Sequence, residues 1–423
     1  MLIKFGGQSS RVCGVTASSV RSRWRADLGF CLLGSSLLAA CLTIGCSDSS
    51  TIASSGPTAQ QVVGVAGTQM TLNGSPWLSR GVVLQGFVRP LALLKAEAPT
   101  DTQAAALLNA QLNYGSDELA AIHAYHADTI RFQISQPALD PNSTLYDPQY
   151  FNDVVEAIKQ ARADGFVVLI MMQDEMITGD TAEAPLPTRE TQNDWDLFTT
   201  VFGSDRGIMF ELYNEPSLMA SASNWQLWLN GGEYKGESYL GMQTLTNHIR
   251  GNGAHNVLVV DGLGVKATDP SNPNQPPISE ASATLQNVLT VADPLNRVVY
   301  AVHPYQHGLS DESLWDEEFG KPSKSVPVWA DEWSAPTGLA LGLGNLSDYQ
   351  VAVDFVNYVR SHSIPICTGA FDVTRFVVSH VAPWTYNNYD SYSPTSATEG
   401  SGTLVYNDFL NDYSRPMTRA DAL

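Results

Sequence analysis

Short apolar runs alternate with amphipathic segments along most of the chain. A fully apolar run such as Phe166–Met172 predicts a strand that is buried on both faces. Apolar residues that recur at helical spacing, as in Tyr150–Arg162, predict a helix with one buried face. The pattern predicts strands at Gly81–Phe87, Thr129–Ile134, Phe166–Met172, Gly207–Tyr213, Asn256–Asp261, Val298–Val302, Val326–Ala330 and Ile364–Phe371. It predicts helices at Ser116–His126, Tyr150–Arg162, Thr191–Phe202, Tyr239–Gly251, Ala281–Val291 and Ser347–Ser361, with Ser347 as an N-cap.

The order of these elements determines the predicted fold class. Strands that alternate with helices form parallel sheets. The chain lacks the glycine fingerprint of an open, doubly wound sheet, so we predict an α/β fold, a closed (β/α)₈ TIM barrel. Apolar runs on both sides of Asn73 and Gly74 predict an N-terminal β-hairpin that plugs the bottom of the barrel. Long βα loops are expected at residues 262–280 and 375–402.

The N-terminal region differs in composition from the rest of the chain. Residues 1–46 combine a basic start with the apolar stretch Leu28–Gly45, a pattern typical of a secretory signal; an uncleaved membrane anchor is the alternative. Residues 47–61 are small and polar and predict a flexible linker. Residues 62–423 then form the barrel domain, which we expect to be secreted or held at a bacterial cell envelope.

The cysteines cluster near the signal segment. The stretch Leu38–Cys41 resembles a bacterial lipobox, and Cys46 ends a poorer match directly before the polar linker. We therefore expect lipidation at Cys41 or Cys46, the alternative being that both are ordinary apolar residues of the signal. Only Cys367 remains in the folded part, so no intramolecular disulfide is expected there. Contact with a membrane is expected only through such an N-terminal lipid.

The charge of the chain limits its partners. The formal net charge is −20. Phosphate groups repel such a surface, which argues against nucleic acid as a partner. A neutral oligosaccharide or polysaccharide is compatible with it.

Two predicted strands end in carboxylates. The stretch Gly207–Pro216 is mostly apolar and finishes in Asn214, Glu215 and a proline that stops strand pairing. The stretch Val326–Trp333 likewise leads to a carboxylate, Glu332. Catalytic groups of (β/α)₈ barrels collect at the C-terminal ends of the strands, so both can face one site. Two facing carboxylates are the minimum set for cleavage of a glycosidic bond.

These strand ends, in this order, resemble glycoside hydrolase family 5, the cellulase family of clan A, over about residues 65–413. The resemblance implies that Glu215 is the general acid/base and that Glu332 is the nucleophile of a retaining double displacement. Asp331 is a competing carboxylate, and alternation along a strand lets only one of the pair point into the barrel mouth.

The resemblance also extends to groups beside the two carboxylates. Arg131 matches the family arginine that pairs with the nucleophile, and an inward-facing arginine needs such a partner. His303 and Tyr305 match a family His-x-Tyr pair, in which the tyrosine holds the nucleophile and the histidine binds sugar hydroxyls. Asn214 can bind a sugar hydroxyl or the carboxyl. His303 and His307 have no third ligand at a recognisable spacing, so no metal site is expected, and no cofactor is implied.

Two further positions concern the sugar. The family places an aromatic platform after strand eight, where this chain has Trp384; Trp333 is the alternative platform, and either can be core packing. Strand three lacks the histidine that is common in the family and ends near Gln173, which can bind a hydroxyl. This departure leaves the subfamily and the substrate open.

The function expected from the sequence is hydrolysis of a β-linked glycan, with endo-β-1,4-glucanase as the leading activity. β-Mannanase, exo-β-glucanase, glycolipid glycosidase or another clan A family remain alternatives. A different class of protein, a non-catalytic glycan-binding barrel at the cell surface, is also open.

Overall fold

The computed structural model describes residues 61–173, 184–267, 278–305, 312–334, 348–373, 378–379, 385–387 and 401–423. The expected signal segment, the linker up to residue 60 and both candidate lipidation cysteines lie outside these residues. So do Trp384, His307 and the expected N-cap Ser347. Within the described ranges, no helix combines the length and the apolar character needed to cross a bilayer.

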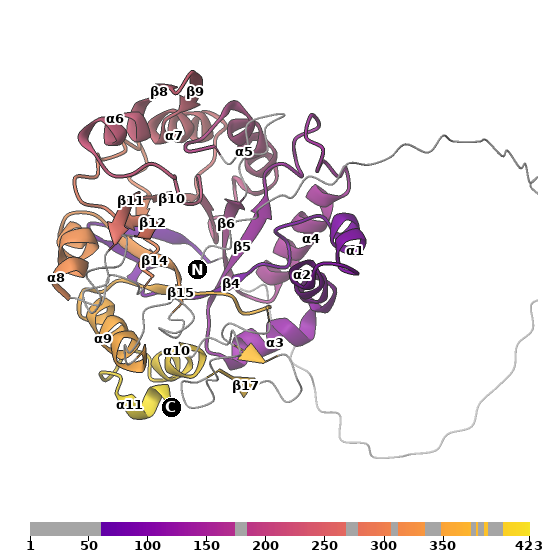
Figure 1. The fold of residues 1–423 in the computed structure, drawn as a ribbon. Coiled ribbons are helices and arrows are strands. Elements are labelled where there is room, and N and C mark those ends of the chain that lie inside the picture. Colours follow the sequence, from indigo (N-terminus) through magenta and orange to yellow (C-terminus); the bar gives the residue numbers. More distant parts are fainter. Residues whose placement is uncertain are drawn as a thin grey trace, which may run out of the picture. The chain divides into compact units, whose positions relative to one another are not determined.

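Eight parallel strands close into a barrel, as predicted (Figure 1). The strands pair in chain order, and the last pairs with the first. Their bounds are β4 Arg80–Leu84, β5 Thr129–Ser135, β6 Val167–Gln173, β7 Ile208–Glu211, β10 Val257–Asp261, β13 Val298–Ala301, β14 Val328–Trp333 and β15 Ile366–Thr368.

Helices surround the strands (Figure 1). Alternate strand residues face the two sides of the barrel wall. Val83, Leu169 and Met209 belong to the inner apolar cluster, whereas Phe132 and Phe210 pack outward in the cluster that includes the helices. The helix bounds are α1 Leu91–Glu97, α2 Thr102–Asn113, α3 Ser116–Ala124, α4 Tyr150–Ala163, α5 Arg189–Phe202, α6 Ala222–Asn230, α7 Met242–Gly251, α8 Glu312–Trp315, α9 Asp348–Ser361, α10 Ser401–Leu410 and α11 Arg419–Ala422.

A small N-terminal sheet closes one end of the barrel. It comprises β1 Val63–Ala66, β2 Gln69–Leu72 and β3 Ser75–Pro76, and the predicted turn at Asn73 and Gly74 joins the last two strands. Val63 and Met70 pack in the inner apolar cluster. The Val63 amide donates to the carbonyl of Arg206, two residues before β7 begins, at 2.9 Å. The sheet therefore covers the N-terminal end of the barrel, as expected.

One predicted helix begins later than its pattern indicated. Residues 239 and 240 belong to β9 Glu237–Leu240, which pairs antiparallel with β8 Gly231–Tyr234, and helix α7 starts only at Met242. Lys235 and Gly236 connect the two strands, and both have positive φ, which is the geometry of a tight hairpin turn. The hairpin thus replaces the first turn of the predicted helix.

The helix predicted at Ala281–Val291 is wrong. Residues 278–284 form β12, which pairs antiparallel with β11 Leu263–Ala267, and no helix follows in the described residues before β13. The expected loop at 262–280 therefore contains much of this hairpin. Small residues such as Ala281 and Ala283 suit either structure, and pairing with β11 decides between them. The remaining short strands are β16 Val378–Ser379 and β17 Thr385–Tyr386.

Candidate active site

The two predicted catalytic carboxylates lie at the C-terminal end of the barrel. Glu215 follows β7, and Glu332 is the penultimate residue of β14. One carboxyl oxygen of Glu215 and one of Glu332 lie within 4.8 Å of each other. Retaining glycosidases hold their two carboxyl groups roughly 5–5.5 Å apart, whereas inverting enzymes separate them by about 6.5–9.5 Å. The spacing matches the retaining arrangement.

Glu332 lies among hydrogen-bond donors. Nη1 of Arg131 donates to its Oε2 at 2.5 Å, and Nε2 of Gln133 donates to the same oxygen at 3.0 Å. The Tyr305 hydroxyl donates to Oε1. Burial raises the pKa of Glu332, but the charges of Arg131 and His303 and the Tyr305 hydrogen bond outweigh it and lower this pKa to about 2. The side chain keeps 13% exposure, so an ionised carboxylate faces the solvent side of the site.

Arg131 is held rigidly by two neighbouring groups. It is fully buried, and its Nε and Nη2 donate to the two carboxyl oxygens of Glu211 at 2.7 and 2.5 Å. Nη2 also donates to Oδ1 of Asn214 at 2.9 Å. A bidentate pair of this kind fixes the guanidinium plane. Glu211 interrupts the apolar strand before Glu215 because it must neutralise Arg131, a role that the sequence reading did not assign.

Glu215 is more deeply buried than Glu332. Only 3% of the residue is exposed, and its Oε1 lies 2.9 Å from Nδ1 of His303. Burial raises the pKa of Glu215, His303 opposes this effect, and the negative charge of Glu332 raises the pKa further. The surroundings thus move the two pKa values in opposite directions: that of Glu332 is lowered and that of Glu215 is raised. Such a difference assigns base and acid roles.

The backbone at Glu215 has an unusual conformation. Its φ is 47°, in the left-handed region that non-glycine residues rarely occupy. The Glu215 amide donates to Oδ2 of Asp261 at 2.7 Å. Asp261 ends β10 and is fully buried. It therefore holds the residue in its strained conformation, a second role that the sequence reading missed; the acidic end of the apolar run 257–261 was the available signal.

The family follows from comparison with known proteins. The cellulase model of glycosyl hydrolase family 5 matches residues 105–368, more than half of the 423-residue chain. The chain belongs to glycosyl hydrolase family 5. It is therefore a glycoside hydrolase, as the strand ends predicted. A search of curated protein sequences found no match.

Solved structures of family 5 enzymes share the fold. A β-glucanase from Saccharophagus degradans in complex with cellotetraose superposes with a TM-score of 0.53 at 16% identity, covering 85% of this chain and 95% of its own. An endocellulase from Pyrococcus horikoshii in complex with cellotetraose gives a TM-score of 0.52 at 16% identity, covering 74% of this chain and 90% of its own. These likenesses confirm the (β/α)₈ barrel.

Three of the expected sugar-binding residues contact protein groups in this hydrolase. His303 is fully buried, and both ring nitrogens face carboxylates, so it cannot bind sugar hydroxyls as expected. Asn214 donates through Nδ2 to Oε1 of Gln173 at 2.9 Å and supports Arg131 with its own oxygen. Gln173 is partly exposed, so its amide still borders the site.

The alternation rule fails at Asp331 and Glu332. Both side chains contact the network around Arg131 and His303: Glu332 through Arg131, and Asp331 through Nε2 of His303 at 3.3 Å. The register of β14 against β15 shifts between Ala330 and Trp333, and such an irregularity lets neighbouring residues share one side of a strand. Only Glu332 has exposed surface, since Asp331 is fully buried.

The alternative platform, Trp333, belongs to the core of the family 5 domain. It is 1% exposed, and its ring stacks on Phe355 of α9 with centroids 4.7 Å apart. A ring covered by a helix cannot support a sugar. The other candidate, Trp384, lies outside the described residues and remains a prediction.

The barrel interior also gathers oxygen and nitrogen atoms of the kind that bind metals. Glu211, Asp261, Asp331 and His303 each bring one such atom within 4.8 Å of the others, which sequence spacing did not reveal. Arg131 already supplies a cation to this cluster through its two bonds to Glu211. Arg131 therefore supplies part of the positive charge that a metal ion would otherwise bring.

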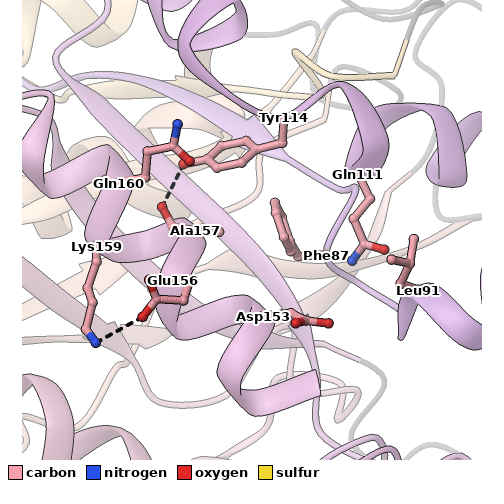
Figure 2. Close-up of a pocket in the computed structure, with 9 residues that line it drawn as sticks. All are labelled: Phe87, Leu91, Gln111, Tyr114, Asp153, Glu156, Ala157, Lys159 and Gln160. Carbon is pink, nitrogen blue, oxygen red and sulfur yellow. Dashed lines mark hydrogen bonds and ion pairs between the residues drawn. The ribbon is translucent and has the colours of Figure 1, made fainter. Parts of the chain in front are cut away.

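A cavity of about 520 Å³ lies elsewhere, between helices α1 and α2 on one side and α4 on the other (Figure 2). Phe87 and Tyr114, which both line it, meet edge to face, and the Tyr114 hydroxyl donates to the carbonyl of Ala157 at 2.7 Å. Glu156 and Lys159 form an ion pair at its rim. No lining residue contacts Glu215 or Glu332, so the cavity is separate from the catalytic groups.

Proposed function

We propose that the chain is a retaining β-glycosidase that cleaves β-1,4-linked glucan within the chain, an endoglucanase. The observation that carries this proposal is the pair of carboxyl oxygens within 4.8 Å in opposite electrostatic settings. Glu332 has a pKa of about 2 and Glu215 a raised pKa. The surroundings thus favour a negative charge on Glu332 and a proton on Glu215, the division that double displacement requires.

In the first step, Glu215 donates its proton to the glycosidic oxygen while a carboxylate oxygen of Glu332 attacks the anomeric carbon. The bond from that carbon to the leaving oxygen breaks, and a glycosyl ester forms on Glu332. Arg131 and Tyr305 orient the attacking carboxylate, since each donates to one of its oxygens. The ion pair of Arg131 with Glu211 holds the guanidinium in place throughout.

In the second step, the ionised Glu215 takes a proton from water. The resulting hydroxide oxygen attacks the anomeric carbon and displaces the Glu332 carboxylate, which returns to its hydrogen bonds with Arg131 and Tyr305. Two inversions at one carbon give a product with the starting β configuration. Glu215 ends protonated, ready for the next cycle.

β-Glucan is the substrate class that the related structures support. Both solved enzymes described above were captured with cellotetraose and are named as a β-glucanase and an endocellulase. This chain is 16% identical to each of these enzymes, so the sugar that it cleaves has to be measured. Cleavage of β-mannan, cleavage from the chain ends, or cleavage of a glycolipid would replace the endoglucanase assignment.

A panel of glycans tests the proposal. The purified barrel domain is incubated with cellotetraose, carboxymethylcellulose, mixed-linkage glucan, β-mannan and a glucosylceramide, and products are followed by chromatography and by ¹H NMR of the fresh anomeric signal. We expect cleavage of the β-1,4-glucans with the β-anomer formed first. Cleavage of mannan or lipid alone would reassign the substrate, and an α-anomer formed first would exclude the retaining mechanism.

Replacing Tyr305 with phenylalanine is expected to move the acidic limb of the kcat/KM profile to higher pH. The hydroxyl stabilises ionised Glu332; without it the pKa of Glu332 rises from about 2, and the nucleophile is protonated at a higher pH. Losing a hydrogen bond to a charged group should also lower the kcat/KM of Tyr305→Phe by about 10- to 100-fold. The measurement is the pH dependence of glucan hydrolysis.

The matched control for this change is Tyr114→Phe, which removes a hydroxyl that donates to a backbone carbonyl outside the site. Its acidic limb should coincide with that of the wild type. If Tyr305→Phe also leaves the limb in place, the tyrosine does not stabilise the nucleophile.

A further inference from the structure

Asp331 has no role in the mechanism above, yet it lies at the centre of the barrel. It is fully buried, and neither of its carboxyl oxygens receives a hydrogen bond from another described residue within normal geometry. Its Oδ1 lies 3.3 Å from Nε2 of His303. A buried carboxylate without strong donors is costly, so this contact needs a functional explanation.

The hydrogens of Arg131 determine the state of Nε2 of His303. Nη2 of Arg131 lies 3.5 Å from Nε2, but its two hydrogens are already directed to Glu211 and Asn214 at 2.5 and 2.9 Å. Nη2 can therefore offer Nε2 only a long, shared hydrogen, weaker than its bonds to Glu211 and Asn214. The other neighbours of Nε2 are the oxygens of Asp331 at 3.3 Å and Asp261 at 3.6 Å. Ionised carboxylate oxygens at these positions would repel a bare Nε2 lone pair, which favours a proton on Nε2.

The other ring nitrogen also faces a carboxyl oxygen. Nδ1 of His303 lies 2.9 Å from Oε1 of Glu215. We propose that Asp331, together with Asp261, is a positioning residue that keeps both ring nitrogens of His303 protonated and so aligns the imidazolium with Glu215. This inference rests on the proposed acid/base role of Glu215.

The arrangement decides which oxygen of Glu215 carries the catalytic proton. A proton on Nδ1 makes Oε1 an acceptor in both states of Glu215, which leaves Oε2 to carry the proton for the leaving group. A neutral His303 with its proton on Nε2 would instead present a lone pair to Glu215 and accept the proton that the sugar must receive. The imidazolium also stabilises Glu215 once it is ionised.

The charged groups around His303 support this state. Burial lowers the pKa of His303, but the charges of Asp261 and Glu332 and the contacts with Asp331 and Glu215 outweigh it and raise this pKa well above its usual value. The same cluster also contains two further charges, Glu211 and Arg131. Among these neighbours the charge of Asp261 raises the pKa of His303 most, and the contact with Asp331 adds to it.

¹⁵N NMR of histidine-labelled protein tests the inference without any substrate. The signals of His303 are assigned by comparison with His303→Gln. We expect both ring nitrogens of the wild type to be protonated through about pH 7, above the usual histidine pKa. In Asp331→Asn, we expect one of them to lose its proton at lower pH. An unprotonated ring nitrogen in the wild type at about pH 6, or an unchanged titration in the variant, overturns the proposal.

The kcat/KM profile on a cleaved glucan provides the second readout. Removing a negative charge makes the Glu215–His303 pair release its first proton at lower pH, so the basic limb of Asp331→Asn should move down by about one to three pH units. The control is Glu118→Gln, another buried carboxyl, whose pKa burial raises to about 9; its basic limb should not move. If Asp331→Asn lowers kcat/KM but leaves the basic limb of the pH profile in place, Asp331 serves only the packing of the site and the inference is wrong.

A double-variant cycle tests whether Asp331 acts through His303. In a His303→Gln background, Asp331→Asn should cause little further loss, whereas additive losses would contradict the inference. If the wild type cleaves no glycan, the proposed function fails, but the NMR titration still decides the protonation of His303.

Discussion

Replacing Glu332 with glutamine is expected to lower β-glucan hydrolysis by on the order of 10⁴- to 10⁶-fold, the range seen when a nucleophile or its partner is removed. An amide cannot form the glycosyl ester of the first step. The fold should persist because Arg131 keeps its bidentate contact with Glu211. Initial rates on cellotetraose and thermal unfolding curves measure the two effects separately.

External azide makes this test specific for the nucleophile. In Glu332→Ala, the truncated side chain leaves space on the face of the sugar that Glu332 attacks. Azide that enters there should restore turnover and yield a glycosyl azide of inverted configuration. Glu118→Gln is the control for loss of a buried carboxyl elsewhere and should hydrolyse glucan at the wild-type rate. A Glu332→Gln variant with full activity would refute the assignment and point to Asp331.

Replacing Glu215 with glutamine is expected to slow cellotetraose cleavage by about 10²- to 10⁴-fold, the usual contribution of general acid–base catalysis. The glycosidic oxygen then departs without a proton, and water attacks without a base. Steady-state kinetics on cellotetraose measures this loss.

An aryl cellobioside with an acidic phenol separates the two functions of Glu215. Its leaving group needs little protonation, so the first step should stay fast in Glu215→Gln while the second becomes slow. We expect a burst of phenol followed by slow turnover, and azide should then release a product of retained configuration. Equal losses on cellotetraose and on the aryl substrate would mean that Glu215 is not the proton donor.

The barrel was predictable because its strands are buried on both faces. Runs such as Phe166–Met172 have no polar residue, and few other structures accommodate them. The hairpins β8–β9 and β11–β12 were not predicted, because their residues are small or polar and carry no strong period. Pairing with the next strand of each hairpin decided those regions, and the period of one short segment does not contain that information.

The proposed catalytic pair could be chosen from the sequence because Glu332 lies near the end of a buried strand and Glu215 follows another. The groups that tune the pair were harder to assign. Glu211 and Arg131 each interrupt an apolar strand, and two buried opposite charges on nearby strands could have been paired from the sequence. The contacts of His303 with Glu215 and Asp331 depend on ring orientation and on the irregular register of β14, which no spacing rule gives.

Trapping the glycosyl ester tests the central assignment most directly. A 2-deoxy-2-fluoro cellobioside with a good leaving group slows both steps but slows the second more, so the sugar accumulates on the enzyme. Mass spectrometry of the digested protein should locate one sugar on Glu332 of the peptide that contains residues 328–334. The same label on Asp331, or inactivation with the sugar on Glu215, would contradict the account.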